Sequence, residues 1–223
     1  HWTKFISIDW GTAAPFYVAW MTVSEGGKLE AQGDWPERYL PPGAVIIYRE
    51  WYGWNGKPNQ GCRMESQAVA RQILAIEDEA KERIDYRVGD SMMWAQSDGP
   101  SVMERMLEAT DGRFVMRQGK KDRAANYAEF LSRLAPDSQH NSAPMFYATA
   151  NCVHFWRTVP SLVLDDINPE KGPATNGEDH CYDSVVYGLR SRPYATTKEE
   201  RWIEHNWKDM QGLKIADPYA VGS

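Results

Sequence analysis

Two acids and a histidine border an apolar stripe in the segment 176–192, NGEDHCYDSVVYGLRSR. A helix in this segment would place four apolar residues on one arc: Tyr182, Val185, Val186 and Leu189. Asp179 and Asp183 lie at the edge of that arc, and His180 lies further round. Two unpaired carboxylates about 4 Å apart would repel each other by roughly 4 kcal/mol at an effective dielectric constant near 20. A bound cation would reverse that sign, so the pattern allows a metal site. It also fits a surface helix with an acid at its start.

Two further acids follow apolar, strand-like runs. Asp9 ends FISID and precedes Gly11, and Asp90 ends DYRVGD after Gly89. Each acid alone also fits a turn or the entry to a helix. Together with Asp183 they can converge at one end of a mixed sheet, where carboxylates suit Mg²⁺ or Mn²⁺. Two such ions about 3.5–4 Å apart can clamp the attacking water and the leaving oxygen of a phosphodiester.

The elements that must position these acids follow from the hydrophobic pattern. A hairpin is predicted over 4–11 and 15–23, and a third strand over 44–52. Strands and helices then alternate: helix 66–84, strand 85–90, helix 99–110, strand 113–118, helix 120–134, strand 143–149 and helix 151–159. Thr175-Asn-Gly-Glu178 matches a capping box that would begin the last helix and explain Asp179. The order predicts an α/β fold: an opening antiparallel meander, then strand–helix alternation, in a mixed sheet flanked by helices.

Composition limits the classes of function. The chain has 223 residues, 42% hydrophobic, with ten Trp and a formal charge of −6. It therefore predicts one folded core without the bulk positive charge of many nucleic-acid-binding proteins. Three cysteines without a CxxC pattern argue against a disulfide framework and favour a reducing cytosol. No apolar run approaches the roughly 18 residues of a membrane helix, so no membrane partner is expected.

A polyanion would have to be held locally. Four basic residues cluster in the predicted strand-to-helix connection RQGKKDR and are candidates for phosphate binding: Arg117, Lys120, Lys121 and Arg123. A solvated charge run is the alternative. The aromatic and basic loop WYGWNGKPNQGCR, 51–63, could touch DNA or staple a hairpin, and the second role is preferred.

Four stretches of the chain resemble the nuclease domain of bacteriophage large terminases, in the ribonuclease-H-like superfamily. They are FISIDWGTAAPFYVAW, VIIYREWYGW, VGDSMMW and, most specifically, EDHCYDSVVYGLRSR, which resembles the family's Asp-His-x-x-Asp-Ala-x-x-Tyr ending. Ser184 stands where the family usually has Ala. The likeness covers roughly residues 3–193, so we expect a nuclease domain over 1–195. A C-terminal helix and tail over 196–223 would be a possible partner-docking segment.

The resemblance implies which residues form the site. Asp9, Asp90 and Asp183 would be metal ligands for Mg²⁺ or Mn²⁺, with two ions expected and Asp9 bridging them. His180 would orient a water or the scissile phosphate, or complete the site. Asp179 is a further candidate ligand, although helix capping explains it adequately. Glu50 matches a family acid, but a core-edge or salt-bridge role is preferred for it.

The resemblance also implies an activity: metal-dependent, largely sequence-nonspecific cutting of concatemeric double-stranded DNA during viral genome packaging. The expected partners are the portal and the small terminase subunit, and the expected location is the host cell cytoplasm. An ATPase domain would drive packaging, but G-x-x-x-x-G-K-[ST] does not occur in this sequence. The motor half is therefore expected to be absent, as in an excised domain.

Three alternatives remain open from the sequence. A nuclease resembling the Holliday-junction resolvases is the nearest enzymatic rival. A structural zinc site could use Cys152, His154, His180 and Cys181, although adjacent helical residues point about 100° apart and would ligate one ion awkwardly. A non-catalytic packaging interaction module, docking a partner through the polar tail, is the third.

Overall fold

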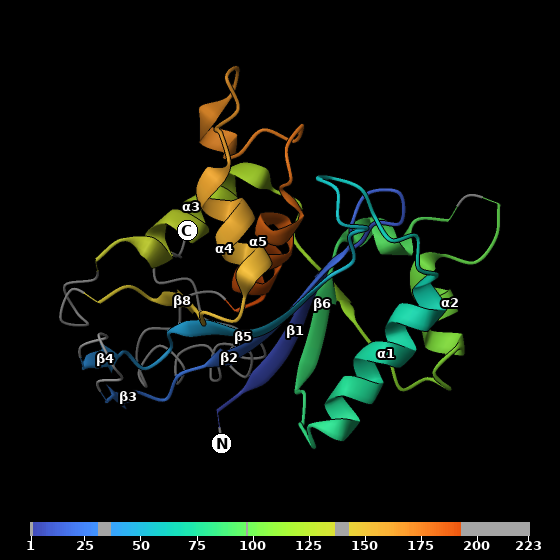
Figure 1. The fold of residues 1–223 in the computed structure, drawn as a ribbon, viewed down its shortest axis with the longest axis horizontal. Helices are drawn as coiled ribbons and strands as arrows, with labels where there is room; N and C mark the ends of the chain where they lie inside the picture. The colour runs from blue at the N-terminus through green and yellow to red at the C-terminus, as the bar shows by residue number, and fades with distance from the viewer. Residues whose placement is uncertain (1, 31–36, 97, 137–142, 193–223) are drawn as a thin grey trace, which may run out of the picture. The chain divides into compact units, whose positions relative to one another are not determined.

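A mixed six-stranded sheet lies at the centre of this computed structural model, which describes residues 2–30, 37–96, 98–136 and 143–192 (Figure 1). The strand order is β7-β6-β1-β2-β5-β8. The bounds are β1 Lys4–Asp9, β2 Tyr17–Val23, β5 Val45–Tyr52, β6 Tyr86–Gly89, β7 Arg117–Gln118 and β8 Phe146–Ala148. A separate two-stranded sheet pairs β3, Gly27–Leu29, with β4, Arg38–Leu40.

Strand direction decides which strand ends share an edge of the sheet. β2 is antiparallel to both β1 and β5, whereas β6 is parallel to β1, β7 to β6 and β8 to β5. Every strand of this sheet except β2 therefore runs in one direction. The C-terminal ends of β1, β6 and β7 lie on the same side of the sheet, which is called the site edge below. The predicted opening meander and the later strand–helix alternation are confirmed.

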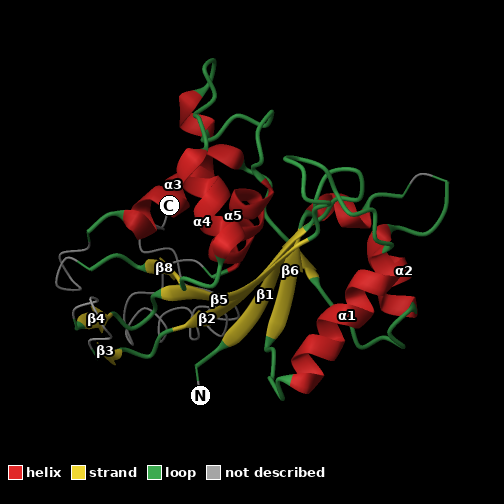
Figure 2. Ribbon diagram, in the orientation of Figure 1, coloured by secondary structure: helices red, strands yellow, loops and turns green. Residues whose placement is uncertain are grey.

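Helices cover both faces of the sheet (Figure 2). One face carries α3 Arg123–Leu134, α4 Val153–Thr158 and α5 His180–Ser191, and the other carries α1 Ser66–Glu79 and α2 Val102–Glu108. Alternate residues of β1 serve the two faces: Phe5 packs in the α5 layer, and Ile6 and Ile8 pack in the α1 layer. Because side chains alternate along a strand, Asp9 lies on the same face as Phe5 and thus on the side of α5.

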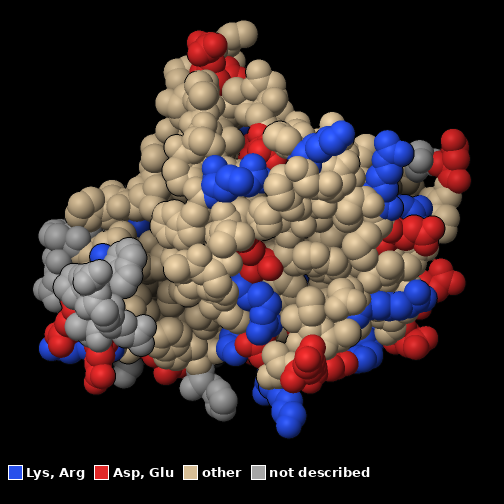
Figure 3. Space-filling model, in the orientation of Figure 1, with Lys and Arg blue, Asp and Glu red and all other residues tan. Residues whose placement is uncertain are grey.

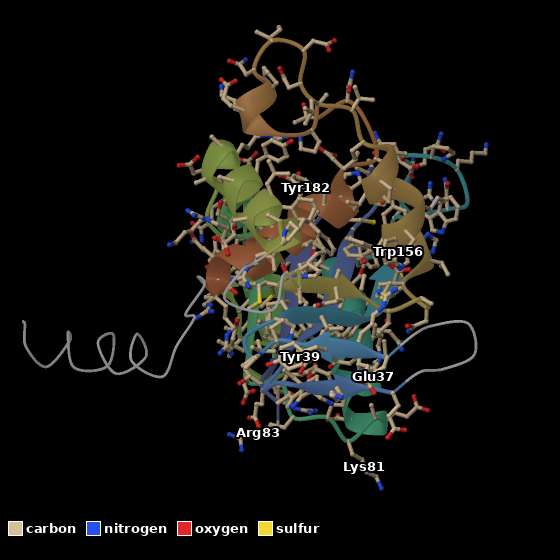
Figure 4. The ribbon with its side chains drawn as sticks, turned by 90° about the vertical axis from the view of Figure 1, so that its left-hand side faces the viewer. Glu37, Tyr39, Lys81, Arg83, Trp156 and Tyr182 are labelled. Carbon is tan, nitrogen blue, oxygen red and sulfur yellow. The ribbon has the colours of Figure 1, made fainter. Side chains whose placement is uncertain are left out.

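The layer that contains α5 is aromatic. The ring of Tyr182 meets that of Phe130 from α3 edge-on, with centroids 5.3 Å apart, and Tyr182 lies among the helices in Figure 4. The four predicted apolar positions of α5 are all buried: Tyr182, Val185, Val186 and Leu189. The predicted arc is therefore the packing face of the helix, and its edge positions can face the sheet edge.

The predicted capping box is wrong. Helix α5 begins at His180, its N-cap is Asp179, and no side chain caps it. The Glu178 carboxylate instead accepts bidentate hydrogen bonds from Arg157, with Nη1–Oε2 2.6 Å and Nη2–Oε1 3.1 Å. The ion pair between Glu178 and Arg157 takes the place of the predicted hydrogen bonds of the capping box. A capping hydrogen bond therefore does not account for the carboxylate of Asp179.

Other elements are shorter than the sequence predicts. Helix α1 ends at Glu79, soon followed by Lys81 with a left-handed φ of 52°. Of the strand predicted over 113–118 only Arg117–Gln118 is formed. Pro100 precedes the helix N-cap, Ser101, whose capping box with Glu104 is complete.

The described residues all belong to one compact unit, His1–Pro193. The predicted C-terminal helix and tail, 196–223, lie outside the described residues. Within the described ranges, every helix is too short or too polar to cross a membrane.

Candidate active site

Asp9 and Asp90 lie at the ends of adjacent parallel strands. Asp9 is the last residue of β1, and Asp90 follows β6, its amide donating to the carbonyl of Ile8 at 3.0 Å. The Asp90 carboxylate also accepts from the amide of Met92 at 3.0 Å and caps a short 3₁₀ helix, Ser91–Trp94. Both the predicted turn role and the predicted sheet-edge position of Asp90 are therefore present.

Small residues bring α5 close to the sheet. The Ser7 hydroxyl of β1 donates to the carbonyl of Ser184, and both side chains are fully buried. One turn later, a Cβ on Gly188 would lie 3.1 Å from the Cβ of Ser7 and 2.7 Å from the sulfur of Met21. This close packing holds the first turn of α5, with Asp183, beside the end of β1.

His180 links the helix to the first strand. Its Nδ1 lies 2.9 Å from Oδ2 of Asp9, and its Nε2 lies 2.8 Å from Oδ1 of Asn59. Burial alone would lower the pKa of His180, but the hydrogen bond to Asp9 and the charges of Asp9, Asp179 and Asp183 raise it above its usual value. The imidazole is thus held in an acidic environment.

Asp9 and Asp179 are buried, Asp183 is half-buried, and these acids repel one another. Burial raises the pKa of Asp9 to about 6, although His180 opposes the shift. Burial and the charges of Asp9 and Asp179 raise the pKa of Asp183 to about 8. Asp179 is 6% exposed, and its burial also raises its pKa. Such carboxylates resist ionisation without a positive charge beside them.

Each of the three predicted metal ligands faces a basic side chain. Asp9 contacts His180, while Lys121 Nζ and Arg123 Nη1 lie 4.0 Å from Oδ1 of Asp90 and Asp183, respectively. Within the ranges that the structure covers, no three His, Cys, Asp or Glu side chains form a group that could hold a metal ion as they stand. The oxygen donors suit Mg²⁺ or Mn²⁺ chemically, but binding would require these side chains to shift and the basic groups to withdraw.

The zinc alternative is not assembled. The Cys152 thiol lies 3.7 Å from the carbonyl oxygen of Ile47, and His154 packs against the rings of Tyr52 and Trp54. Burial raises the pKa of the Cys152 and Cys181 thiols, which disfavours the thiolates that zinc needs. The four predicted residues form no metal-binding group in the part of the chain that is described.

The predicted DNA-binding residues separate into two places. Lys121 and Arg123 lie beside the acids, and Lys120 is exposed next to them. Arg117 instead lies over the ring of Tyr86, 3.9 Å from its centroid, and donates to the carbonyl of Ser191 at the far end of α5. On the face shown in Figure 3, basic and acidic side chains occur in small interspersed groups.

Glu50 has a structural role. Its carboxylate accepts from the amides of His154 and Phe155 at 2.6 and 2.9 Å and from the Tyr17 hydroxyl at 2.7 Å. It therefore caps α4 at the core edge, in line with the preferred sequence interpretation.

Two residues near the acids were missed by sequence reasoning. Tyr187 lies one turn after Asp183, and the charges of Asp9, Asp183 and Asp90 add to the burial that raises its pKa. Its spacing of four from Asp183, within the motif already recognised, could have indicated it. Asn59 contacts His180 from the loop after β5, and no local pattern marks it.

The fold is similar to that of solved large terminases. The large terminase of a thermophilic bacteriophage matches in two crystal forms, with TM-scores of 0.58 and 0.56 and identities of 16% and 15%; each match covers 85% of this chain and 39% of that chain. The P22 large terminase nuclease domain has a TM-score of 0.55 and 12% identity over 86% of this chain and 82% of its own. No protein-family model matches the chain, and no curated protein matches it significantly. The chain therefore has the fold of the nuclease domain of bacteriophage large terminases, a mixed α/β fold consistent with the ribonuclease-H-like class.

Proposed function

We propose that this chain is a metal-dependent endonuclease that cuts concatemeric double-stranded DNA, largely without sequence specificity, during viral genome packaging. The observation that carries the proposal is the convergence of Asp9, Asp90, Asp183 and His180 at one sheet edge. The fold shared with a terminase nuclease domain supports the same reaction class. Convergence of buried acids is common at catalytic sites, because chemistry needs groups that are unfavourable in isolation.

Three carboxylates would hold the metal ions. Asp9 contacts His180 and interacts with the charge of Asp90, and Asp183 interacts with the charge of Asp9, so Asp9 is the proposed bridging ligand. Asp179 is buried, lacks a capping bond and is the proposed additional ligand. Two bound Mg²⁺ or Mn²⁺ ions would activate water and stabilise the charge that develops on the phosphodiester.

His180 would act as an orienting group. Its ring is fixed at both nitrogens, so it presents a defined edge to whatever binds beside Asp9. To orient a water or the scissile phosphate by hydrogen bonding, one ring nitrogen would have to exchange its present partner for the water or phosphate oxygen.

Basic side chains would bind the DNA backbone locally. Lys120, Lys121 and Arg123 precede or begin α3 at the edge where the acids lie, and Arg117 extends the set along β7. When metal ions neutralise Asp90 and Asp183, Lys121 and Arg123 would be released from them to pair with phosphates. This exchange would offset the unfavourable net charge of −6.

The proposed setting is the packaging motor. The terminase chain of the thermophilic bacteriophage is much longer than the part matched, since the match covers 39% of it. An ATPase domain, the portal and the small terminase subunit are proposed partners in the host cell cytoplasm. The tail after residue 195 is the proposed docking segment.

A cleavage assay tests the proposal. The 223-residue chain is incubated with supercoiled plasmid and Mn²⁺ or Mg²⁺, alongside Asp9→Asn, Asp183→Asn and, as a control, Asp78→Asn. Asp78 pairs with Arg113 on the opposite face of the sheet. We expect wild type and Asp78→Asn to cut and both site variants to be inactive while remaining folded by circular dichroism. Equal cutting by Asp183→Asn would remove α5 from the mechanism, and exclusive cutting of a four-way junction would favour the resolvase-like alternative.

A further inference from the structure

A single loop holds His180 from the side opposite Asp9. The loop runs from Trp54 to Gly61, between β5 and α1, and its ends pair with each other in an isolated bridge. Asn59 places its side-chain oxygen 2.8 Å from His180 Nε2 while Asp9 lies 2.9 Å from Nδ1. The imidazole is therefore held at both nitrogens, which leaves its ring little freedom to rotate.

The loop is itself fastened on two sides. On one side the Gly61 amide donates to the carbonyl of Ala13 at 2.7 Å, in the connection that follows Asp9. A Cβ at Gly61 would lie 2.3 Å from the oxygen of Thr12, so only glycine fits this approach. The loop thus rests on the segment that leaves β1.

On the other side the loop joins the start of α5. The backbone N–H of Asn59 donates to Oε1 of Glu178 at 3.2 Å, and the Tyr52 hydroxyl donates to the same oxygen at 3.1 Å. Arg157 binds both oxygens of Glu178, and its guanidinium lies 4.8 Å from the ring centroid of Trp54. The network positions Asn59 through its backbone as well as through its side chain.

The backbone of Asn59 has a φ of 55°, in the left-handed region. Glycine meets this conformation without steric cost, and asparagine is among the few other residues that tolerate it. Glycine already occupies the nearby positions 53, 56 and 61. The amide side chain at position 59 therefore adds a contact that the turn itself does not require.

We propose that Asn59 is a positioning residue that fixes the His180 ring against Asp9, so that the loop Trp54–Gly61 is part of the nuclease centre. The inference rests on the proposed function. Asn59 acts through His180 and does not itself reach the phosphate. Its removal should impair turnover more than DNA binding.

Asn59→Gly is the informative variant, because glycine keeps the left-handed backbone and removes only the amide. Asn59→Asp keeps an oxygen acceptor at the same place. Asn55→Ala is the matched control: among the described residues Asn55 bonds within the loop, accepting from the Lys57 backbone amide at 3.0 Å and donating to the Gln60 side chain at 3.2 Å. The control loosens the loop without touching His180.

Two measurements on the full chain decide the matter. In ¹⁵N NMR without metal, with the His180 signals assigned by His180→Asn, Asn59→Gly should move the His180 ring nitrogen signals and Asn55→Ala should not. In plasmid cleavage at saturating Mn²⁺, Asn59→Gly should lower kcat by about 10–100-fold, the usual range for such supporting contacts, with KM for DNA unchanged. Asn59→Asp should restore most of that loss.

The proposal is overturned if Asn59→Gly leaves either the ring signals or kcat unchanged. It is also overturned if Asn55→Ala lowers kcat as much as Asn59→Gly does, or if Asn59→Asp lowers kcat as much as Asn59→Gly does. A wild-type chain that cuts no DNA with either metal would refute the proposed function and any catalytic role of Asn59 with it. The NMR result would then separately show whether the contact exists.

Discussion

The Nδ1 of His180 lies 2.9 Å from Oδ2 of Asp9, although 171 positions separate the two residues in sequence. The contact joins the first turn of α5 to the last residue of β1. It places a basic ring where the charge of a cation would otherwise stabilise the buried carboxylate. The strand, the helix and the acids of the site are thus linked at one point.

Metal affinity should increase with pH. Burial raises the pKa of Asp9 to about 6 and that of Asp183 to about 8, and both must lose their protons to bind a cation. Calorimetric titration with Mg²⁺ should show tighter binding at pH 8 than at pH 6, with protons released. Equal affinity at both values would mean that neither carboxylate binds the ion.

Asp183→Asn should stabilise the metal-free protein at alkaline pH. Since the folded pKa is raised above the unfolded value of about 3.9, the folded state binds more protons than the unfolded state between these values. The contribution of the Asp183 carboxyl to the free energy of unfolding is therefore fully present at low pH, and it is lost as the pH rises through about 8. Urea unfolding with EDTA should show the Asn variant gaining on the order of 4 kcal/mol over wild type between pH 5 and pH 9, because each pH unit below the folded pKa contributes about 1.4 kcal/mol. A pH-independent difference would contradict the shifted pKa.

Enlarging Gly188 should displace α5 from β1. A Cβ there already comes within 3.1 Å of Ser7, so Gly188→Val should cost about 1–3 kcal/mol through overpacking. Cleavage should fall further than stability explains, because Asp183 moves with the helix. Gly188→Ala should cost less, since the flexible Met21 side chain can withdraw. Comparing thermal unfolding with cleavage at a temperature where both variants are folded checks this expectation.

Glu50 should support stability and not metal binding. Glu50→Ala leaves the amides of His154 and Phe155 and the Tyr17 hydroxyl without their acceptor. We expect a loss of about 1–3 kcal/mol in the free energy of unfolding. Mn²⁺ affinity in the folded protein should be unchanged, and a large loss of affinity would place Glu50 in the site.

Lys121→Gln should weaken DNA binding. Lys121 lies beside Asp90 at the site edge, so its loss should remove one phosphate contact and reduce the log–log salt slope by about 1. Lys28→Gln is the control, because Lys28 lies on β3 of the separate β3–β4 sheet and pairs with Glu37, just before β4. Mobility shifts over a salt series in Ca²⁺ measure both slopes. Identical slopes for wild type and Lys121→Gln would assign Lys121 to the solvated surface.

The sequence alone determined the strands that carry Asp9 and Asp90 and the helix face that positions Asp183. Strand ends and helix arcs are local properties, because apolar periodicity and turn residues act over a few positions. His180 was identified as a site residue from the resemblance of the segment EDHCYDSVVYGLRSR to the ending of the terminase nuclease motif. The antiparallel β1–β2 hairpin followed from the same local signals, since a short connection favours antiparallel neighbours.

Only the tertiary structure decided what the remaining residues do. Glu178 forms an ion pair with Arg157 and not the predicted capping box. Arg117 stacks on Tyr86, and Asn59, in a loop, hydrogen-bonds His180. In each case a partner distant in sequence competed with the local choice or supplied a contact that no local pattern specifies. Long-range hydrogen bonds and ion pairs depend on which segments the sheet order brings together, and that order is a property of the whole fold.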